Sequence, residues 1–406
     1  MNVLLIHQYA RHPSSWGGTR FYCLCRALVE YGHDVTVIAS RYEFKKGEAH
    51  RDVPEEMIDG VRYFWLDAGK EGYGLLNRGA GMIGFTLAAM RKATSLSSQF
   101  DVVVSSSPHL LQTLGAERFA ARKGLPFVLE IRDIWPMSLS DVLGVSKWHP
   151  VWQALRLIEK HLYRRASWIV TLLPGSQDWI AGSGGDRSAI EFVPNGVDAS
   201  SVSQSYPHRD GETFKIIYAG SHGAMNRLDT VIRAAKIAES HPRGDRIRVE
   251  LIGYGPHKDQ LQELAREIEA RTVTFLDAVP RAEAIDKIGN ADAAVIHMVD
   301  APAFKYGISP NKLFDYMLTE RPIIFGVRSS YDPVALSDCG ISVPPEDPHA
   351  MAEAMIELAS MSVEERKSMG ERGREFVMKE HEWRVLGPRF VNVLDKAVAR
   401  FRKDGA

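Results

Sequence analysis

The sequence predicts a two-domain α/β protein in which each domain has a parallel β-sheet covered by helices. Three observations lead to this prediction. Short apolar segments alternate with helical ones, the alternation stops at a polar segment near the middle, and 406 residues exceed what one ordinary core needs. We expect an N-terminal domain over 1–205 and a C-terminal domain over 206–384, with a final helix over 385–406 that packs back on the first domain.

The first half of the chain consists of successive β-α-β units. NVLLIHQY predicts a buried strand, the glycine-containing loop SSWGG follows it, and RFYCLCRALVEYGHDVTVIAS predicts a helix and a second strand. Three more strands, with helical segments between them, are expected in FDVVVSSSP, GLPFVLEIRD and ASWIVTLLPG. Because helical crossovers join parallel strands, the carboxyl ends of these strands should meet at one edge of the sheet.

The same pattern restarts after EFVPNGVDASSVSQSYPHRDGETF, a polar stretch without apolar period that we interpret as a linker. Strands are expected in KIIYAG, RVELIGYG, VTFLDAV, AAVIHM and PIIFGV, and the chain then ends in a largely helical segment that is interrupted at HEWRVLGPRF. Ligands of open α/β sheets bind outside the carboxyl ends of the strands. We therefore expect site residues directly after strands.

Composition excludes several classes of protein. A net charge of −1 and a pI near 6.9 argue against nucleic-acid binding, which needs a basic surface. Three cysteines, Cys23, Cys25 and Cys339, give neither a disulfide framework nor a zinc pattern. The first residues are typical of a buried strand rather than a signal peptide, and no apolar stretch is long enough for a membrane span. These features favour a cytoplasmic protein that is soluble or peripheral to a membrane.

Two segments of the second domain carry residues suited to an anion. In YGISPNKLFDYM, Lys312 stands at the expected start of a helix, where unpaired backbone N–H groups favour negative charge. In YAGSHGAMNRLDTV, Gly220 and Gly223 follow a strand, and Arg227 precedes a helix from which its planar guanidinium can hold phosphate oxygens. We expect Arg227 and Lys312 to share one pyrophosphate; a solvated arginine is the alternative.

Asp315 and a pair of glycines are further candidates. Asp315 lies on the first turns of the helix that Lys312 begins, where it could accept hydrogen bonds from ligand hydroxyl groups or interact with the helix dipole alone. Gly17 and Gly18 follow the first strand, where their amides can approach a phosphate or only form the turn. SWGGTRF lacks the third glycine of G-x-G-x-x-G, which disfavours a nicotinamide enzyme.

Polar residues also follow strands of the first domain. Arg132 and Asp133, in LEIRDIWP, act on a substrate or form a buried ion pair that holds the loop. His109 follows Pro108 after DVVVSSS, where it contacts a substrate or has a structural role.

The segment WHPVWQALRLIEKHLYRRASW predicts a helix with aromatic and basic residues at its margins. One interpretation is a surface for anionic lipid, and the alternative is core packing of the apolar face with solvated arginines. The residues of this possible lipid surface are Trp148, Trp152, Arg156, Arg164 and Arg165.

Five motifs then occur in a consistent order: GGTR after the first strand, EIRDIWP, VPNGVD before the linker, GYGP after a second-domain strand, and SPNKLFDYM. With them, nearly the whole chain resembles the retaining, nucleotide-sugar-dependent glycosyltransferases of the GT-B fold, the group 1 or family 4 type, and most closely their bacterial surface-polysaccharide members. The resemblance implies two doubly wound Rossmann-like domains that face each other across a cleft, the first for the acceptor and the second for the nucleotide-sugar donor.

The resemblance also implies roles for single residues. Arg227 would take the place of the family's phosphate-binding lysine, with Lys312 assisting, and Asp315 that of a ribose-holding glutamate that is one methylene longer. Asp133 would orient acceptor or donor as the third catalytic residue. Implied donor contacts are Gly17, Gly18, Gly220, Ser221, Gly253, Tyr254, Ser309, Pro310, Asn311 and Asp315. Implied acceptor or sugar contacts are Ser106, His109 and Arg132.

Three positions depart from the family pattern. Gly307 stands where the family has the first of two glutamates, Ser221 where an arginine usually follows the glycine of YAG, and Ser106 where a histidine often ends the DVVV strand. We expect the serine, asparagine and lysine of SPNK to replace the missing carboxylate.

The implied activity is transfer of a hexosyl or N-acetylhexosaminyl group, with retention, from a nucleotide diphosphate sugar to a lipid-linked saccharide. Uridine is the expected base, and O-antigen, capsule or exopolysaccharide biosynthesis is the expected setting. No cofactor, metal or nucleic acid is expected, and the protein would work in the cytoplasm, peripheral to the inner face of the membrane. The alternatives are a sugar-nucleotide epimerase of the same fold and a noncatalytic nucleotide-sugar-binding partner.

Overall fold

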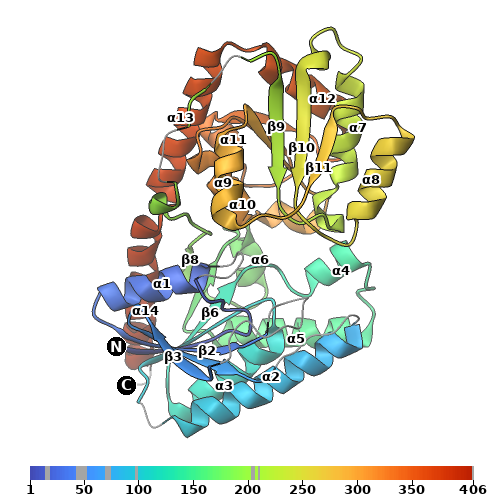
Figure 1. The fold of residues 1–406 in the computed structure, drawn as a ribbon. Coiled ribbons are helices and arrows are strands. Elements are labelled where there is room, and N and C mark those ends of the chain that lie inside the picture. The colour runs from blue at the N-terminus through green and yellow to red at the C-terminus, as the bar shows by residue number, and fades with distance from the viewer. Residues whose placement is uncertain are drawn as a thin grey trace. The chain divides into compact units, whose positions relative to one another are not determined.

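A computed structural model of the chain describes residues 1–13, 19–42, 53–68, 75–96, 99–202, 206–208 and 211–404. The chain forms two compact units, each an α/β structure with its own sheet (Figure 1). The first unit comprises Met1–Asn195 and Trp383–Ala406, and the second comprises Gly196–Glu382. The expected α/β architecture with predominantly parallel sheets is confirmed.

The sheet of the first unit has the strand order β3-β4-β2-β1-β5-β6-β7-β8 among the described residues. All neighbouring strands are parallel except β3 and β4, which form an antiparallel hairpin. The strands are β1 (Asn2–Ile6), β2 (Asp34–Ser40), β3 (Glu55–Ile58), β4 (Val61–Leu66), β5 (Val102–Ser106), β6 (Phe127–Ile131), β7 (Trp168–Thr171) and β8 (Ile190–Phe192).

The hairpin of β3 and β4 was missed in the sequence interpretation. Asp59 and Gly60 connect its strands, and both have positive φ, 46° and 80°. Asp-Gly is the dipeptide that a tight hairpin turn of this kind favours, so the turn itself was the available signal. β3 alternates between exposed and half-buried residues at the edge of the sheet, which makes it weakly apolar as a sequence.

Helices cover both faces of the first sheet. On one face α2 packs on α3 and α3 packs on α5, while α1 and α14 pack together on the other (Figure 1). Gly387 of α14 allows this close approach, because a Cβ there would lie 2.5 Å from the Cβ of Ala27 in α1. The helices are α1 (Arg20–Glu30), α2 (Leu75–Ser95), α3 (Leu110–Lys123), α4 (Met137–Leu143), α5 (Pro150–Arg165), α6 (Gln177–Gly182) and α14 (Trp383–Asp404).

The second unit has a parallel sheet with the order β11-β10-β9-β12-β13-β14 among the described residues. Its strands are β9 (Phe214–Ala219), β10 (Ile247–Ile252), β11 (Val273–Leu276), β12 (Ala293–His297), β13 (Ile323–Gly326) and β14 (Gly340–Val343). The strand order reverses direction at β9 and β12, so the carboxyl ends of these neighbours form the switch point at which doubly wound sheets bind ligands.

One apolar core of this unit lies under α7, α8 and α12, and a second lies under α9, α10 and α13. The helices are α7 (Leu228–Ala238), α8 (Lys258–Glu267), α9 (Arg281–Gly289), α10 (Asn311–Leu318), α11 (Pro333–Ser337), α12 (Pro348–Ser360) and α13 (Val363–Glu380). The predicted break in the C-terminal helical segment is shorter than expected. Only His381 and Glu382 separate α13 from α14, and Pro388 lies inside α14. Within the described part of the chain, none of the helices is long and apolar enough to cross a membrane.

Candidate functional site

Lys312, at the carboxyl edge of the second sheet, differs from an ordinary surface lysine in the burial and the hydrogen bonds of its ammonium. It is the second residue of α10, and its partly buried ammonium donates to the Tyr218 hydroxyl over 2.9 Å and to Asn226 Oδ1 over 2.6 Å. Burial lowers the pKa of Lys312 to about 7. In the described residues no carboxylate pairs with it, so this cation lacks a counter-anion.

The loop between β9 and α7 is folded around that ammonium. The Ser221 carbonyl accepts two hydrogen bonds of 2.8 Å, one from the Tyr218 hydroxyl and one from Asn226 Nδ2. The same two side chains accept from Lys312, which closes a ring of four hydrogen bonds. An ammonium has three donors. Two are used within the described structure, which leaves one for a ligand.

Two glycines let backbone approach this place closely. A Cβ at Gly220, the residue after β9, would lie 3.5 Å from Lys312 Nζ and 3.0 Å from the Tyr218 hydroxyl. Gly253, after β10, has φ of +148°, and a Cβ there would lie 1.8 Å from the Gly220 carbonyl oxygen. Any larger residue would therefore push the two loops apart. Both glycines were predicted as donor contacts, and both lie at the strand ends as expected.

Arg227 is held by acidic side chains instead of facing Lys312. Its guanidinium makes a bidentate pair with Asp229, with both bonds at 3.0 Å, and donates to Glu346 over 2.7 Å. The backbone of Arg227 is left-handed, with φ of 38°. Asn226 is the residue that contacts Lys312. That Arg227 and Lys312 share one pyrophosphate stays a prediction.

A buried histidine fixes Asn226. His297 ends β12, and its Nε2 accepts the Glu346 backbone N–H over 2.9 Å while Nδ1 lies 3.2 Å from the Asn226 carbonyl oxygen. Since Nε2 is an acceptor, the proton must be on Nδ1, which donates to Asn226. Burial lowers the pKa of His297 and keeps it neutral in this arrangement.

Asp315 lies one turn after Lys312 on the same face of α10. Its Oδ1 accepts from Arg281 Nη2 over 2.6 Å, and burial raises the pKa of Asp315 although Arg281 opposes that shift. α10 itself is fixed by Tyr316, whose hydroxyl accepts from the Ala219 backbone N–H and donates to the Ala219 carbonyl. The helix therefore presents Lys312 and Asp315 at a fixed spacing.

An open pocket of about 460 Å³ lies after β12 and β13 of the same unit. An ion pair between Arg328 and Asp300, 3.1 Å long, lies in its wall, and the Asp300 N–H donates to Glu346. Through Glu346 the pocket connects to Arg227 and so to the loop around Lys312. Its lining residues are Asp300, Ala301, Pro302, Lys305, Arg328, Ser329 and Ser330.

The other predicted donor contacts lie around the start of α10 or in the loops after β9 and β10. Pro310 is the N-cap residue of α10, while Ser309 is half-buried beside it. Ser221, Tyr254 and Asn311 are exposed. Gly17 and Gly18 lie outside the described residues. Gly307, at the position of the missing glutamate, is buried with φ of +108°, a conformation that favours glycine.

In the first unit, the buried ion pair at the carboxyl edge of the sheet is Arg20 with Glu130. Arg20 Nη2 lies 2.7 Å from Glu130 Oε2, and the two side chains are 1% and 0% exposed. Arg20 also donates to the carbonyls of Val193 and Pro194, and Ser106 Oγ donates to Glu130 over 2.9 Å. Ser106 is thus buried and bonded to Glu130, and its contact with a sugar stays a prediction.

His109 has a structural role as well. It is fully buried, Nδ1 caps α3 by accepting the Gln112 N–H over 3.1 Å, and Nε2 lies 3.1 Å from the Met82 carbonyl of α2. Burial lowers its pKa to about 4. Both ring nitrogens are used inside the unit, which favours the structural role that was one of the two sequence alternatives.

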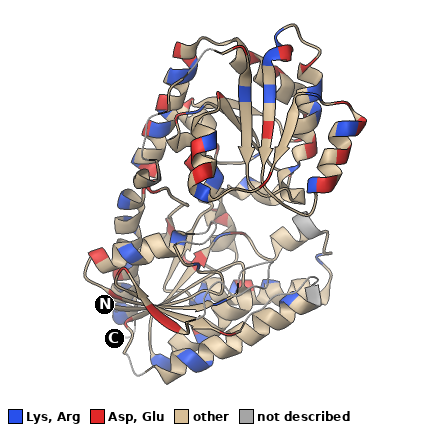
Figure 2. Ribbon diagram, viewed as in Figure 1, with Lys and Arg blue, Asp and Glu red and all other residues tan. Residues whose placement is uncertain are grey.

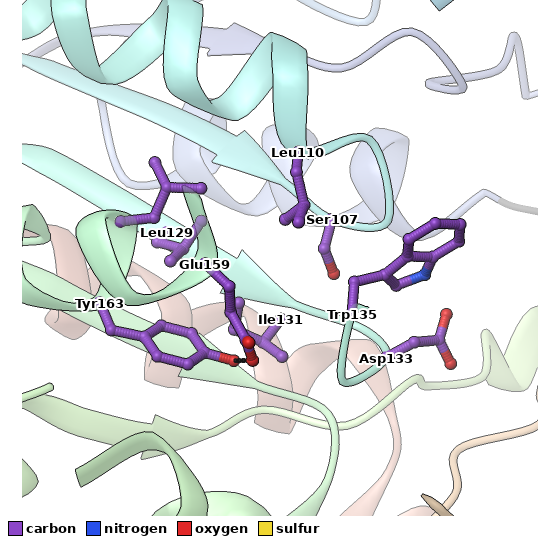
Figure 3. A pocket seen from close by; sticks show the side chains of 9 residues that line it. Ser107, Leu110, Leu129, Ile131, Asp133, Trp135, Glu159 and Tyr163 are labelled. Carbon is purple, nitrogen blue, oxygen red and sulfur yellow. Dashed lines mark hydrogen bonds between the residues drawn. The ribbon is translucent and has the colours of Figure 1, made fainter. Parts of the chain in front are cut away.

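Asp133 and Arg132 are not the buried pair that was one of the sequence alternatives. Asp133 is exposed, and in Figure 3 its carboxylate points away from the hydrogen bond between Glu159 and Tyr163. The Arg132 backbone N–H donates to Ser107 Oγ over 2.9 Å. The loop holding Asp133 is therefore fixed through backbone, and desolvation raises the pKa of the Asp133 carboxyl although Arg132 opposes that shift.

The proposed lipid surface on α5 is only partly exposed. Trp152 is 8% exposed and its Nε1 donates to Ser140, while Arg156 pairs with Glu159 and stacks over Trp179. Of the two tryptophans in this predicted lipid surface, Trp148 is the exposed one, with 89% of its side chain accessible. Arg164 and Arg165 are exposed, and Arg165 pairs with Glu117.

Sequence interpretation missed Tyr218, Asn226, Tyr316 and Arg281 in the second unit and Arg20 with Glu130 in the first. Most of them lie inside motifs that were noted, YAG, GGTR, EIRD and SPNKLFDYM, but their partners are distant in sequence. Within the described residues, no three His, Cys, Asp or Glu side chains are grouped so that they could hold a metal ion.

Both units match family models of glycosyltransferases. Residues 17–196 match the family model "Glycosyl transferase 4-like domain", and residues 213–361 match "Glycosyl transferases group 1". In Corynebacterium glutamicum, a GDP-mannose-dependent monoacylated alpha-(1-6)-phosphatidylinositol monomannoside mannosyltransferase is 25% identical over 225 residues, 52% of this chain and 57% of that protein. The match thus spans little more than half of that relative.

Two solved structures match over nearly their full length. Sucrose-phosphate synthase from Thermosynechococcus elongatus has a TM-score of 0.75 at 15% identity, covering 98% of this chain and 99% of that one. HepE of Anabaena, in complex with UDP, has a TM-score of 0.66 at 13% identity, covering 97% and 100%. The chain has the GT-B fold and, with its two consecutive domains, belongs to the group 1 glycosyltransferases.

Proposed function

We propose that the protein transfers a sugar from a nucleotide diphosphate sugar, with UDP as the carrier, to a lipid-linked saccharide in the assembly of a surface polysaccharide such as O-antigen, capsule or exopolysaccharide. The observation that supports this best is the Lys312 ammonium. It is desolvated, it has no counter-anion in the described structure, and one of its donors remains for a ligand. A group with those properties at a strand-end switch point suits a diphosphate.

The chemistry follows from where charge develops. When the bond between the sugar and the diphosphate breaks, negative charge grows on the leaving phosphate oxygen, and a preorganised cation stabilises it without rearrangement. Lys312 is preorganised by Tyr218 and Asn226. In the retaining reaction that we propose, the leaving phosphate itself takes the proton of the incoming acceptor hydroxyl.

We propose that other residues bind the rest of the nucleotide sugar, beyond the diphosphate at Lys312. Asp315, one helical turn from Lys312, accepts hydrogen bonds from ribose hydroxyls, and the open pocket beside Asp300 and Arg328 takes the sugar. In the first unit, the exposed carboxylate of Asp133 orients the acceptor. Arg227, which Asp229 and Glu346 already hold, keeps the loop around Lys312 in place.

A nucleotide panel tests this proposal. Thermal unfolding is measured with UDP, GDP, ADP and their sugar derivatives, because a ligand that binds only the native state raises apparent stability by mass action. We expect UDP and a UDP-sugar to raise the unfolding temperature most. We also expect the protein to transfer the sugar to a lipid-linked acceptor. A larger shift with GDP overturns the uridine assignment. Epimerisation of the sugar without any acceptor indicates the epimerase alternative, and binding without turnover indicates a noncatalytic partner.

Contact with a membrane is proposed through α2 of the first unit. Ile83 and Leu87, 52% and 55% exposed, lie one turn apart, and the helix carries Arg78, Arg91 and Lys92 but no acidic residue (Figure 2). A helix with exposed apolar residues and only positive charge is typical of one that lies on an anionic membrane surface. A relative whose name specifies a phosphatidylinositol-based acceptor supports a lipid-linked acceptor here.

Liposome flotation tests that surface. We expect the wild-type protein to float with anionic liposomes at low salt and to bind less at high salt, because salt screens the attraction. The double change Ile83→Glu and Leu87→Glu should abolish flotation. Tyr31→Glu, at an exposed residue after α1 on the opposite face of the sheet, is the matched control and should leave it unchanged. Equal flotation of the α2 variant would contradict the proposal.

A further inference from the structure

The ion pair between Arg281 and Asp315 connects two elements that are far apart in sequence. Arg281 is the first residue of α9 and follows the loop after β11 at the edge of the sheet, whereas Asp315 lies in α10. Arg281 Nη2 donates to Asp315 Oδ1 over 2.6 Å, with side chains that are 38% and 17% exposed. A single oxygen of the carboxylate is used in this contact.

The second oxygen of Asp315 is available to a ligand. Within the described residues no hydrogen bond is made to Oδ2, and an ionised carboxylate can accept at both oxygens. Burial raises the pKa of Asp315, and Arg281 acts against that shift. Without the guanidinium, a carboxyl group in this position would take up a proton more readily and lose acceptor capacity.

Geometry along α10 relates this carboxylate to the ammonium of Lys312. The residues are three apart, so they share a helix face and are separated by about 4.5 Å of axial rise. α10 cannot slide, because Tyr316 binds both backbone groups of Ala219 at the end of β9. Lys312 and Asp315 are therefore held at a fixed separation along α10, an ammonium followed by a carboxylate that accepts hydrogen bonds.

We propose that Arg281 is a specificity-determining positioning residue that holds the Asp315 carboxylate in one orientation, so that Oδ2 accepts a hydrogen bond from a ribose hydroxyl and the protein prefers ribonucleotides to 2′-deoxyribonucleotides. This inference rests on the proposed function. An aspartate, with its short side chain, has few orientations, and the guanidinium holds the one in which Oδ1 is bound and Oδ2 is left for the ligand.

The test uses UDP and 2′-deoxy-UDP as probes in calorimetric titrations of the full chain. Wild-type protein should bind UDP roughly tenfold or more tightly than 2′-deoxy-UDP, as expected for a hydrogen bond to a charged acceptor. Arg281→Gln and Asp315→Asn should each reduce the difference between the two affinities, mainly by weakening the binding of UDP. Arg243→Gln, an exposed change on the same unit, is the control and should keep the preference.

A pH series separates a positioning role from a merely structural one. In Arg281→Gln the Asp315 pKa should rise further, so the remaining preference for UDP should disappear at a higher pH than in wild-type protein when pH is lowered from 7 to 5. Arg281→Lys, which keeps the charge, should restore part of the preference. If UDP binds normally and Arg281→Gln retains the full preference, the inference is wrong. If neither nucleotide binds wild-type protein, the proposed function itself fails.

Discussion

Replacing Lys312 with alanine should lower the rate of sugar transfer by about 10²-fold or more, with the protein still folded. Under the proposed function, the Lys312 ammonium contacts the diphosphate, and within the described residues it has no carboxylate partner. Its loss also leaves Tyr218 and Asn226 bonded to the Ser221 carbonyl, which should keep the loop in place. The rate of transfer from a UDP-sugar measures the activity of the variant, and thermal unfolding measures whether it is still folded.

The variant Lys312→Arg makes this prediction more specific. Arginine keeps the charge, but its guanidinium is wider than an ammonium. The backbone of Gly220 lies close to Lys312 Nζ, since a Cβ built at Gly220 would lie 3.5 Å from it. We expect it to recover part of the binding and little of the turnover. Near-normal turnover of Lys312→Ala in a folded protein would show that the diphosphate is stabilised elsewhere.

Replacing Arg20 with methionine should cost about 3–5 kcal/mol of the free energy of unfolding, because it leaves the Glu130 carboxylate buried without a compensating positive charge and with only the Ser106 hydroxyl as a described donor to it. Glu130 is 0% exposed, and Arg20 also satisfies the carbonyls of Val193 and Pro194. Denaturant unfolding followed by circular dichroism measures the effect. Arg187→Ala, which breaks an exposed pair with Asp178 in the same unit, is the control and should change stability by at most about 1 kcal/mol.

A second variant distinguishes the buried charge from lost packing. In Arg20→Met with Glu130→Gln the carboxylate is gone, so we expect the double variant to be more stable than Arg20→Met alone, which a double-mutant cycle would show as coupling. Equal stability of the two variants would mean that the ion pair is not the origin of the loss.

The sequence predicted the fold and which residues follow the strands of the second sheet, because strand ends and glycines are local signals. Gly220, Gly253 and Lys312 all lie at the carboxyl edge of the second sheet, as expected. The contacts of Arg227 could not be predicted from the sequence. Its backbone is left-handed and its guanidinium pairs with Asp229 and Glu346, while the neighbouring Asn226 contacts Lys312.

In the first unit, the sequence did not reveal side-chain contacts between residues that are distant in sequence. His109 follows a strand, as a ligand-binding residue would, but it caps α3 and contacts the Met82 carbonyl. Arg20 and Glu130 are 110 residues apart and form the buried pair, whereas the adjacent Arg132 and Asp133 do not. Adjacent charges in a sequence are easily noticed, but burial is decided by the packing of whole elements.

The most direct test of the central claim, that Lys312 holds the diphosphate of the donor, is a calorimetric titration of UDP between pH 7 and pH 9. The terminal phosphate of UDP, with a second pKa near 6, is already ionised in this range. Lys312, with a pKa of about 7 when free, loses its proton, so affinity should fall by up to about tenfold per pH unit. In Lys312→Arg, which stays charged, affinity should be nearly constant. UDP binding that is equally tight at both pH values and in Lys312→Ala would contradict the account.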